Sequence, residues 1–460
     1  MKSIIKIILP AIILTLSLLF SVTPALASGP ANAPEAAASL LAEVDSGMVL
    51  YSRYMDKKHP VDSLAKVMTL LLTVNACETG AVKKDEILEM TESAYYNINA
   101  MSTTCKILPG EEMSLLDLMY CAFVGNANEA CNLLAERISG SPEAFITKMN
   151  AYADSLGCRN TKFINAHGQY NENQYSTAMD LFIIFREAMS HPLFVEISGT
   201  YKHAVESTNM SGPRTLVAEN ELINPNTKYF YPPCTAGKAS ATFEGGYSLV
   251  SFAEANGLTL IAVVLGSDTV YNEDESVDMR NLSESRKLYE WGFSQFSWRT
   301  VLSPDLPIAN TPIMHGAGAD YVNLRPESAI RLLLNNDVST DEFVKTITIY
   351  HVEKGETLYA PVSAGDVLGE VVLSRKGEKY GPVLLIANTD VELHRVQYIR
   401  MQINEILHSK AARITMWSLI VIVLGYVALV IRYNVVRRKR LRLIKEAKRK
   451  LREERRDDSF

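Results

Sequence analysis

Residues 61–69 read V-D-S-L-A-K-V-M-T and place Ser63 three residues before Lys66, at the start of an apolar run. Residues i and i+3 share one face of a helix, so the Lys66 amine can reach the Ser63 hydroxyl. A serine is a poor nucleophile until a neighbouring base removes its proton. The pattern therefore predicts a nucleophilic serine at the start of a buried helix. The alternative is that Asp62 or Ser63 only caps such a helix.

Two apolar blocks lie near the ends of the 460-residue chain. Residues 1–27 combine two lysines, an apolar run and the sequence A-L-A, which is the pattern of a secretory signal peptide cleaved after Ala27. An uncleaved anchor is the alternative. Residues 414–431 contain eighteen residues without a charge, enough to cross a bilayer as a helix.

The tail at 432–460 holds 13 basic and 5 acidic residues, a net charge of +8. Cytoplasmic flanks of membrane spans are rich in lysine and arginine, so we expect this tail in the cytoplasm, near anionic lipid heads. A nucleic-acid-binding tail is the less economical alternative. Without the tail and the two lysines of the signal peptide, the exported part carries −16. An acidic exported body argues against a nucleic-acid partner.

Six cysteines and eight histidines form none of the usual metal-ligand spacings. The chain has no C-x-x-C pair and no H-E-x-x-H motif. We therefore expect no metal. Export permits disulfides, but the spacing leaves open whether the cysteines pair or stay as buried thiols.

Strand and helix patterns predict an α+β fold. Residues 39–51 alternate around D-S-G as in a β-hairpin, 115–138 are apolar at helical spacing, and 234–266 suggest an antiparallel sheet. Short strands with glycine turns fill 301–401. The predicted organisation is a signal peptide at 1–27, a linker at 28–38, a catalytic domain at 39–300, a β-rich domain at 301–401, a linker at 402–413, a transmembrane helix at 414–431 and a basic tail at 432–460.

Three motifs follow one another in the order used by penicilloyl-type serine enzymes. They are S-x-x-K at Ser63, Asn126-Ala127-Asn128 in place of S-x-N, and Lys238-Ala239-Ser240 in place of K-T-G. Further matches are N-E-A-C-N-L-L-A-E at 128, T-K-F-I-N-A-H-G at 161, A-V-V-L-G at 262, A-G-D-V-L-G-E-V at 364 and G-P-V-L-L-I-A at 381. From about 41 to 401 the chain resembles the serine-type D-alanyl-D-alanine carboxypeptidases, the low-molecular-weight penicillin-binding proteins.

This resemblance implies a penicillin-binding/β-lactamase-like transpeptidase domain, with helices on an antiparallel sheet, followed by a small β-rich domain. It implies that Ser63 attacks the D-Ala-D-Ala bond of a peptidoglycan stem peptide and that Lys66 takes the serine proton. It also implies that Asn128 holds the substrate backbone and Lys238 steers its carboxylate, without a cofactor. The oxyanion hole would be the backbone N–H groups of Ser63 and Ala241.

Three positions depart from the family pattern. Asn126 replaces a serine that can relay a proton, Ala239 lacks a hydroxyl for the substrate carboxylate, and Ser240 adds a side chain where glycine allows close approach. Asn126, Ala239, Ser240 and Ala241 are nevertheless expected to line the substrate site, with Lys238. The alternative function is a catalytically weakened or inactive relative that acts as a wall-binding or scaffold protein.

A β-lactamase is a weaker alternative, because no clear acidic deacylation element is apparent between the second and third motifs. The loop containing His167 is expected to be structural, with the histidine at the surface capping a turn. The expected partners are peptidoglycan peptides, β-lactams and, through the C-terminal helix, the membrane. The expected location is the cell membrane, with a single span and the catalytic body outside. The expected roles are in cell-wall biogenesis and cell shape.

Overall fold

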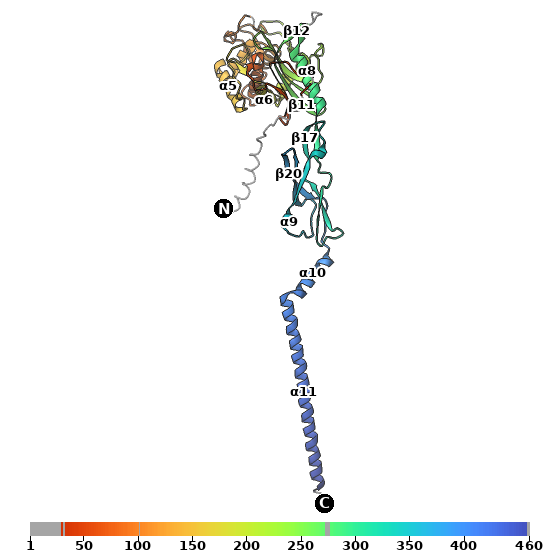
Figure 1. Cartoon of the computed structure of the whole chain (residues 1–460). Coiled ribbons are helices and arrows are strands. Elements are labelled where there is room, and N and C mark those ends of the chain that lie inside the picture. Colours follow the sequence, from red (N-terminus) through yellow and green to blue (C-terminus); the bar gives the residue numbers. More distant parts are fainter. Residues whose placement is uncertain (1–28, 31–32, 101, 272–276, 458–460) are drawn as a thin grey trace. The chain divides into compact units, whose positions relative to one another are not determined.

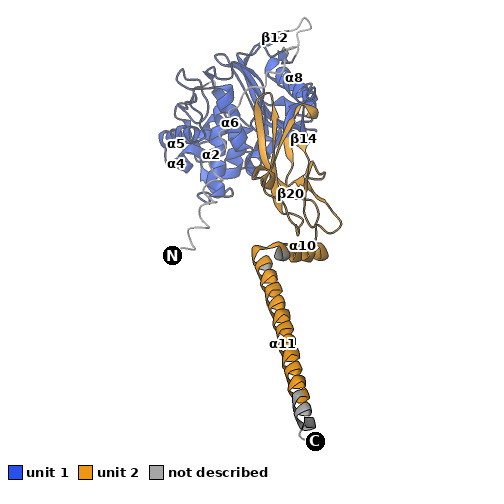
Figure 2. Cartoon of the chain, turned by 60° about the horizontal axis from the view of Figure 1, so that its bottom comes forward, with its two compact units in different colours: residues 1–299, 332–339 blue, residues 300–331, 340–460 orange. Residues whose placement is uncertain are grey.

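The computed structural model describes residues 29–30, 33–100, 102–271 and 277–457. The predicted signal peptide at 1–27 lies outside these described residues. The chain divides into two compact units, residues 1–299 with 332–339 and residues 300–331 with 340–460 (Figure 2). Nothing in the sequence indicated that 332–339 would cluster with the first unit. The domain boundaries at 300 and 401 stay predictions.

A five-stranded antiparallel sheet forms the centre of the first unit, in the order β2-β1-β11-β10-β9. Its strands are β1 (Ala38–Glu43), β2 (Val49–Arg53), β9 (Cys234–Thr242), β10 (Gly246–Ala255) and β11 (Leu258–Ser267). The hairpin predicted at 39–51 is the pair β1–β2, and the sheet predicted at 234–266 is β9–β10–β11. The α+β prediction is confirmed.

Both faces of this sheet are covered, which explains why β11 is a continuous apolar run. Ile261, Val263 and Leu265 pack in one core cluster with the helices of the amino-terminal half. Leu260, Ala262 and Val264 alternate with them and pack in a second cluster, which includes Leu288 and Tyr289 of helix α8 (Arg280–Gln295). Figure 1 shows α8 on one side of β11, with α5 and α6 on the other.

The helical layer carries the segments of the first two motifs. Its helices are α2 (Lys66–Glu78), α3 (Leu115–Phe123), α4 (Asn128–Ser139), α5 (Pro142–Ser155), α6 (Ala178–Ala188) and α7 (Pro192–Ser198). The apolar run predicted at 115–138 is two helices, because the backbone of Asn126 has φ 56° and breaks the helical geometry. This break brings Asn128 to the first turn of α4.

Short elements connect these layers. They are β3 (His59–Pro60), η2 (Asp62–Ala65), β4 (Ile87–Glu89), η3 (Ser93–Tyr95), β5 (Glu112–Ser114), β6 (Tyr175–Ser176), β7 (Lys202–Val205), β8 (Arg214–Val217), η4 (Glu221–Ile223), β12 (Thr269–Tyr271), β13 (Val277–Met279) and β14 (Phe296–Leu302).

The second unit contains another antiparallel five-stranded sheet, in the order β15-β16-β20-β19-β18. Its strands are β15 (Ala309–Pro312), β16 (Tyr321–Pro326), β18 (Val344–Ile349), β19 (Val367–Arg375) and β20 (Glu378–Ala387). The remaining elements of the carboxy-terminal part are β17 (Ile330–Asn335), η5 (Thr340–Glu342), α9 (Tyr350–Glu353), α10 (Arg395–His408) and α11 (Lys410–Asp457).

Helix α11 is a single helix of 48 residues. Among the described residues it is the one helix long and apolar enough to cross a membrane, over Arg413–Arg449. Its large apolar side chains from Ile414 to Ile431 are exposed, as expected for a surface that lipid would cover. The predicted span at 414–431 thus lies within a helix of suitable length and composition.

Candidate active site

Ser63 lies on a short 3₁₀ turn, η2, that leads directly into α2. Side chains at i and i+3 eclipse one another in a 3₁₀ turn, which brings Ser63 and Lys66 to the same side. Ser63 is half-buried and Lys66 is buried. The capping alternative is wrong, because Val61 and Ala65 occupy the N-cap positions and no side chain caps either element.

The Lys66 amine is held by two neutral acceptors. Its Nζ donates to Asn128 Oδ1 at 2.7 Å and to the carbonyl of His167. Among the described residues these are its hydrogen-bond partners, and neither is a carboxylate. Burial therefore dominates and lowers the pKa of Lys66, although nearby acidic groups such as Glu129 and Glu219 partly oppose this effect. A lowered pKa increases the fraction of the lysine that is neutral at a given pH, and only the neutral amine can accept a proton.

The loop around His167 packs against Lys66 and supplies the carbonyl that accepts from its amine. His167 is 2% exposed, so the expectation of a surface histidine is wrong. Burial, with the Lys66 charge nearby, lowers the pKa of His167 to about 3, which leaves the imidazole neutral. Gly168 has φ 83°, and a Cβ there would lie 2.0 Å from the carbonyl oxygen of Asp62. Only glycine fits this close approach, which locks the loop against the Ser63 turn.

The two asparagines of the second motif make different contacts. Asn128 begins α4 and accepts from Lys66, as described. Asn126 has a left-handed backbone, which asparagine tolerates better than serine. Its side-chain Nδ2 donates to Oε1 of Glu219 at 2.8 Å. The replacement of serine by Asn126 is thus accompanied by a backbone conformation and a carboxylate contact that the sequence did not reveal.

Strand β9 presents the third motif on alternating faces. Lys238 faces the helical layer, where its Nζ donates to the carbonyl of Phe123 at 2.9 Å and lies 3.9 Å from Glu219 Oε2. Burial lowers the pKa of Lys238 to about 8. Ala239 points the other way and is buried in the second core cluster with Leu249. Of the predicted site residues, Ala239 and Ala241 lie on this opposite face of β9, so their side chains are not brought together with the others.

Ser240 lies on the same face as Lys238 and reaches the turn of the first motif. Its Oγ accepts a hydrogen bond from the backbone N–H of Ser63 at 3.2 Å. That N–H is one of the two groups predicted to form the oxyanion hole. The second predicted group belongs to Ala241, which is exposed in β9 opposite Tyr247. The Ser240 hydroxyl therefore competes with the oxyanion for the backbone N–H of Ser63.

Asp62 fixes the Ser63 turn to the end of β9. The residue has φ 42°, and its carboxylate Oδ2 accepts from the Thr242 hydroxyl at 2.6 Å. The same hydroxyl accepts from the backbone N–H of Gly245 at 2.9 Å. Burial raises the pKa of Asp62, and the bond from Thr242 opposes this rise. The sequence offered only a capping role for Asp62, so this tie between distant segments was missed.

Glu219 is the second residue that sequence reasoning missed. It lies between β8 and η4, within the sequence A-E-N-E-L at 218–222. No acidic element had been expected between the second and third motifs, yet this carboxylate contacts Asn126 and approaches Lys238. A second glutamate, Glu221, stands two positions further on. Composition alone could not tell which of the two turns toward the site.

All six cysteines carry free thiols: Cys77, Cys105, Cys121, Cys131, Cys158 and Cys234. Over the described ranges, no group of three or more His, Cys, Asp or Glu side chains is arranged to hold a metal ion.

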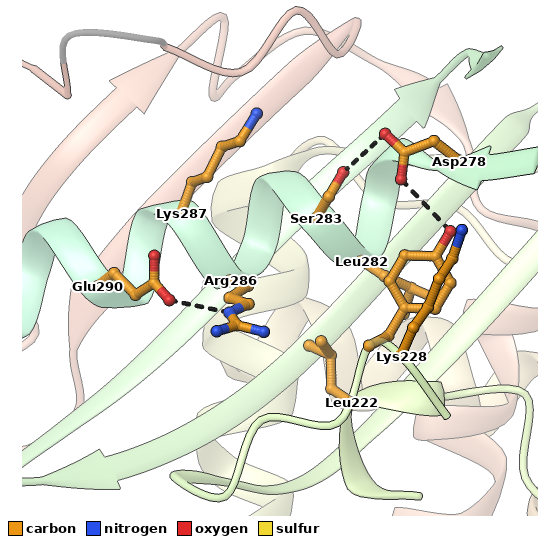
Figure 3. Close-up of a pocket in the computed structure, with 9 residues that line it drawn as sticks. Leu222, Lys228, Asp278, Leu282, Ser283, Arg286, Lys287 and Glu290 are labelled. Carbon is orange, nitrogen blue, oxygen red and sulfur yellow. Dashed lines mark hydrogen bonds and ion pairs between the residues drawn. The ribbon is translucent and has the colours of Figure 1, made fainter. Parts of the chain in front are cut away.

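A pocket beside α8 is separate from this constellation (Figure 3). Along α8, Arg286 pairs with Glu290 at 2.8 Å, and Ser283 donates to Asp278 at 3.3 Å. None of the nine residues that line this pocket is a predicted site residue. The pocket therefore gives no reason to move the candidate active site away from Ser63.

Comparisons with known proteins point to one family. The family model described as D-alanyl-D-alanine carboxypeptidase matches residues 25–269. D-alanyl-D-alanine carboxypeptidase DacF of Bacillus subtilis is 28% identical over 360 residues, 78% of this chain and 87% of the relative. DacC of Escherichia coli is 28% identical over 382 residues, 81% of this chain and 89% of the relative.

Among solved structures, penicillin binding protein 5 from Haemophilus influenzae matches with a TM-score of 0.57 and 25% identity. The match covers 78% of this chain and 98% of that protein. The family model spans more than half of the 460 residues. The chain therefore belongs to the serine-type D-alanyl-D-alanine carboxypeptidase family.

Proposed function

We propose that this protein is a serine D-Ala-D-Ala carboxypeptidase that trims peptidoglycan stem peptides through an acyl-enzyme on Ser63. The buried Lys66 amine carries the proposal, because it is held by Asn128 beside the Ser63 turn, within a chain of this family. Family membership and the relatives' activity favour an enzyme over the non-catalytic scaffold alternative.

In the acylation step, Ser63 Oγ bonds to the carbonyl carbon of the penultimate D-Ala. The serine proton passes to the neutral amine of Lys66, whose pKa burial lowers. The C–N bond then breaks, and the amine of the terminal D-Ala takes up the proton that Lys66 received and leaves. Water next attacks the ester, which returns Ser63 to its free form and releases the shortened peptide.

The other predicted residues bind and orient the peptide. Asn128, already in contact with Lys66, is proposed to hold the substrate backbone. Lys238 is proposed to attract the substrate carboxylate, since its ammonium is buried on the same face of β9 as Ser240. The backbone N–H groups of Ser63 and Ala241 are proposed to stabilise the oxyanion.

The direct test is the release of D-Ala from a stem pentapeptide by the full-length chain in detergent. Released D-Ala is quantified against the same preparation of a Ser63→Ala variant. We expect Ser63-dependent release. If the folded protein neither releases D-Ala nor becomes acylated by a β-lactam, the proposed activity is contradicted.

The Ser240 hydroxyl leads to a prediction about rate. We expect Ser240→Gly to accelerate acylation by about two- to tenfold, because it frees the Ser63 N–H from a hydrogen bond worth about 0.5–1.5 kcal/mol. The measurement is the acylation rate with a fluorescent penicillin in stopped flow.

One companion variant makes this prediction sharper. Ser240→Ala removes the hydroxyl but keeps a Cβ, so it separates the hydrogen bond from the added bulk. Ala239→Thr is no part of the test, since that side chain lies in the second core cluster. An unchanged or slower acylation rate in both Ser240 variants would show that the hydroxyl does not compete with the oxyanion.

We also propose a topology for the anchored protein. Helix α11 supplies an apolar segment at 414–431, and the following 29 residues carry the net +8 charge. The catalytic domain at 39–300 and the β-rich domain at 301–401 are then outside, and the tail at 432–460 is in the cytoplasm.

The topology predicts a protease result. Protease added to intact protoplasts is expected to remove an epitope in the 39–401 region and to spare an epitope at the C-terminus. After lysis with detergent, both epitopes are lost. A body that resists protease until lysis would reverse the proposed orientation.

A further inference from the structure

The Glu219 carboxylate lies beside Lys238, the residue whose amine is proposed to bind the substrate carboxylate. Its Oε1 accepts from Asn126 Nδ2 at 2.8 Å, and its Oε2 lies 3.9 Å from Lys238 Nζ. One carboxylate thus spans the second and third motifs. Oε1 is held by the Asn126 amide and Oε2 lies at ion-pair distance from Lys238, which places the negative charge beside the ammonium.

The pairing is asymmetric in exposure. The side chain of Lys238 is 3% exposed, whereas that of Glu219 is 40% exposed. Lys238 also donates to the carbonyl of Phe123, a neutral acceptor. Over the described ranges, Glu219 is the carboxylate that forms an ion pair with Lys238. A ligand that approaches Lys238 from solvent therefore meets the negative charge of Glu219 close to the ammonium.

Electrostatics then gives opposite results for two kinds of substrate. A free carboxylate that binds Lys238 is attracted by its ammonium and repelled by the Glu219 carboxylate, which lies 3.9 Å from that ammonium. A leaving residue whose carboxyl group is blocked as an amide gains little from Lys238 and loses little to Glu219. The built-in carboxylate thus offsets the advantage that Lys238 alone would give to a free C-terminus.

We infer that Glu219 is a specificity-determining residue that relaxes the requirement for a free terminal carboxylate, so that peptides with a blocked carboxyl group on the leaving residue are accepted as well. The inference rests on the proposed function, because it takes Ser63 as the nucleophile and Lys238 as the carboxylate-binding group. Asn126 contributes to this specificity, since its side-chain amide donates to the Glu219 carboxylate and orients it.

The test compares two substrates and two variants of the full-length chain in detergent. The substrates are diacetyl-L-Lys-D-Ala-D-Ala and its C-terminal amide. Glu219→Gln keeps a side-chain carbonyl that can accept from Asn126 but removes the charge. Glu221→Gln is the matched control, because it removes the same charge two residues away, where the structure shows no contact with Asn126 or Lys238 among the described residues.

We expect Glu219→Gln to raise kcat/KM for the free acid by about two- to tenfold at pH 6, mainly through a lower KM, since a nearby like charge is removed. This pH lies below the Lys238 pKa of about 8, which Glu219 helps to raise. The amide should change by less than about threefold, and Glu221→Gln should leave both substrates unchanged. Wild type should hydrolyse the amide at least as efficiently as the free acid.

Two results would overturn the inference. The first is a loss of rate on both substrates in Glu219→Gln, which would assign Glu219 to proton transfer. The second is a wild-type kcat/KM more than tenfold higher for the free acid than for the amide. This result contradicts the inference even if the Glu219→Gln variant does not fold. The Ser63→Ala blank tests the proposed function separately, because hydrolysis that survives in the blank contradicts Ser63 and says nothing about Glu219.

Discussion

Replacing Ser63 by alanine is expected to abolish covalent capture of β-lactams and to reduce D-Ala release by about 10⁴-fold or more. Removal of the nucleophile leaves no oxygen to form the acyl-enzyme, and such losses are among the largest known for serine hydrolases. The measurement is intact-mass spectrometry of full-length protein after incubation with excess penicillin. Wild type should gain the mass of one ring-opened drug molecule, and Ser63→Ala should gain none.

The control for this experiment is Ser207→Ala. Ser207 is exposed and follows β7, outside the candidate active site, so its loss should leave the adduct intact. Peptide mapping of the wild-type adduct should place the drug on the segment that contains residues 61–69. An adduct that persists in Ser63→Ala would assign the chemistry to another residue.

The second large effect is expected for Lys66→Arg. Arginine keeps the positive charge, but its guanidinium stays protonated at all accessible pH values and cannot accept the Ser63 proton. Loss of a general base typically costs about 10²–10⁴-fold in rate. We therefore expect a loss of acylation within that range. An exposed lysine, Lys57, provides the matched control as Lys57→Arg.

The pH profile tests the same assignment without relying on folding of the variant. Lys66 is active as a base in its neutral form, and burial lowers its pKa below the usual value for lysine. The wild-type acylation rate should therefore rise with pH as Lys66 loses its proton. Lys238 has a pKa of about 8, so binding of a carboxylate substrate should weaken above that pH.

Lys66→Arg should lack the rising limb, and the residual activity should be flat with pH on that side. A variant that keeps the full wild-type profile would show that the base is a different group. Acylation by a β-lactam and hydrolysis of the peptide should share the rising limb, because both begin with attack by Ser63.

Periodic patterns predicted the elements that hold the candidate site. The Ser63–Lys66 spacing, the apolar run of β11 and the hairpin at 39–51 depend on local periodicity and burial, which are readable in one dimension. The order of the three motifs also pointed to the family. These features follow from repeated choices of residue type along short segments.

The contacts missed from the sequence all join distant segments. The bond from the Ser63 N–H to Ser240 spans 177 positions, and the bond from Asn126 to Glu219 spans 93. Each depends on one side chain in one rotamer, which leaves no periodic trace. The helix break at Asn126 was missed for a related reason, because a single left-handed residue decides it.

The alternation of β9 has a consequence for how this protein can change over time. Lys238 and Ser240 face the candidate active site, while Ala239 fills the core on the far side. Inserting or deleting one residue within 234–242 would send the lysine ammonium into an apolar cluster and turn an alanine toward the substrate. Single substitutions on either face are survivable by comparison. Evolution is therefore expected to constrain the length of this strand more strictly than the identity of any one of its side chains.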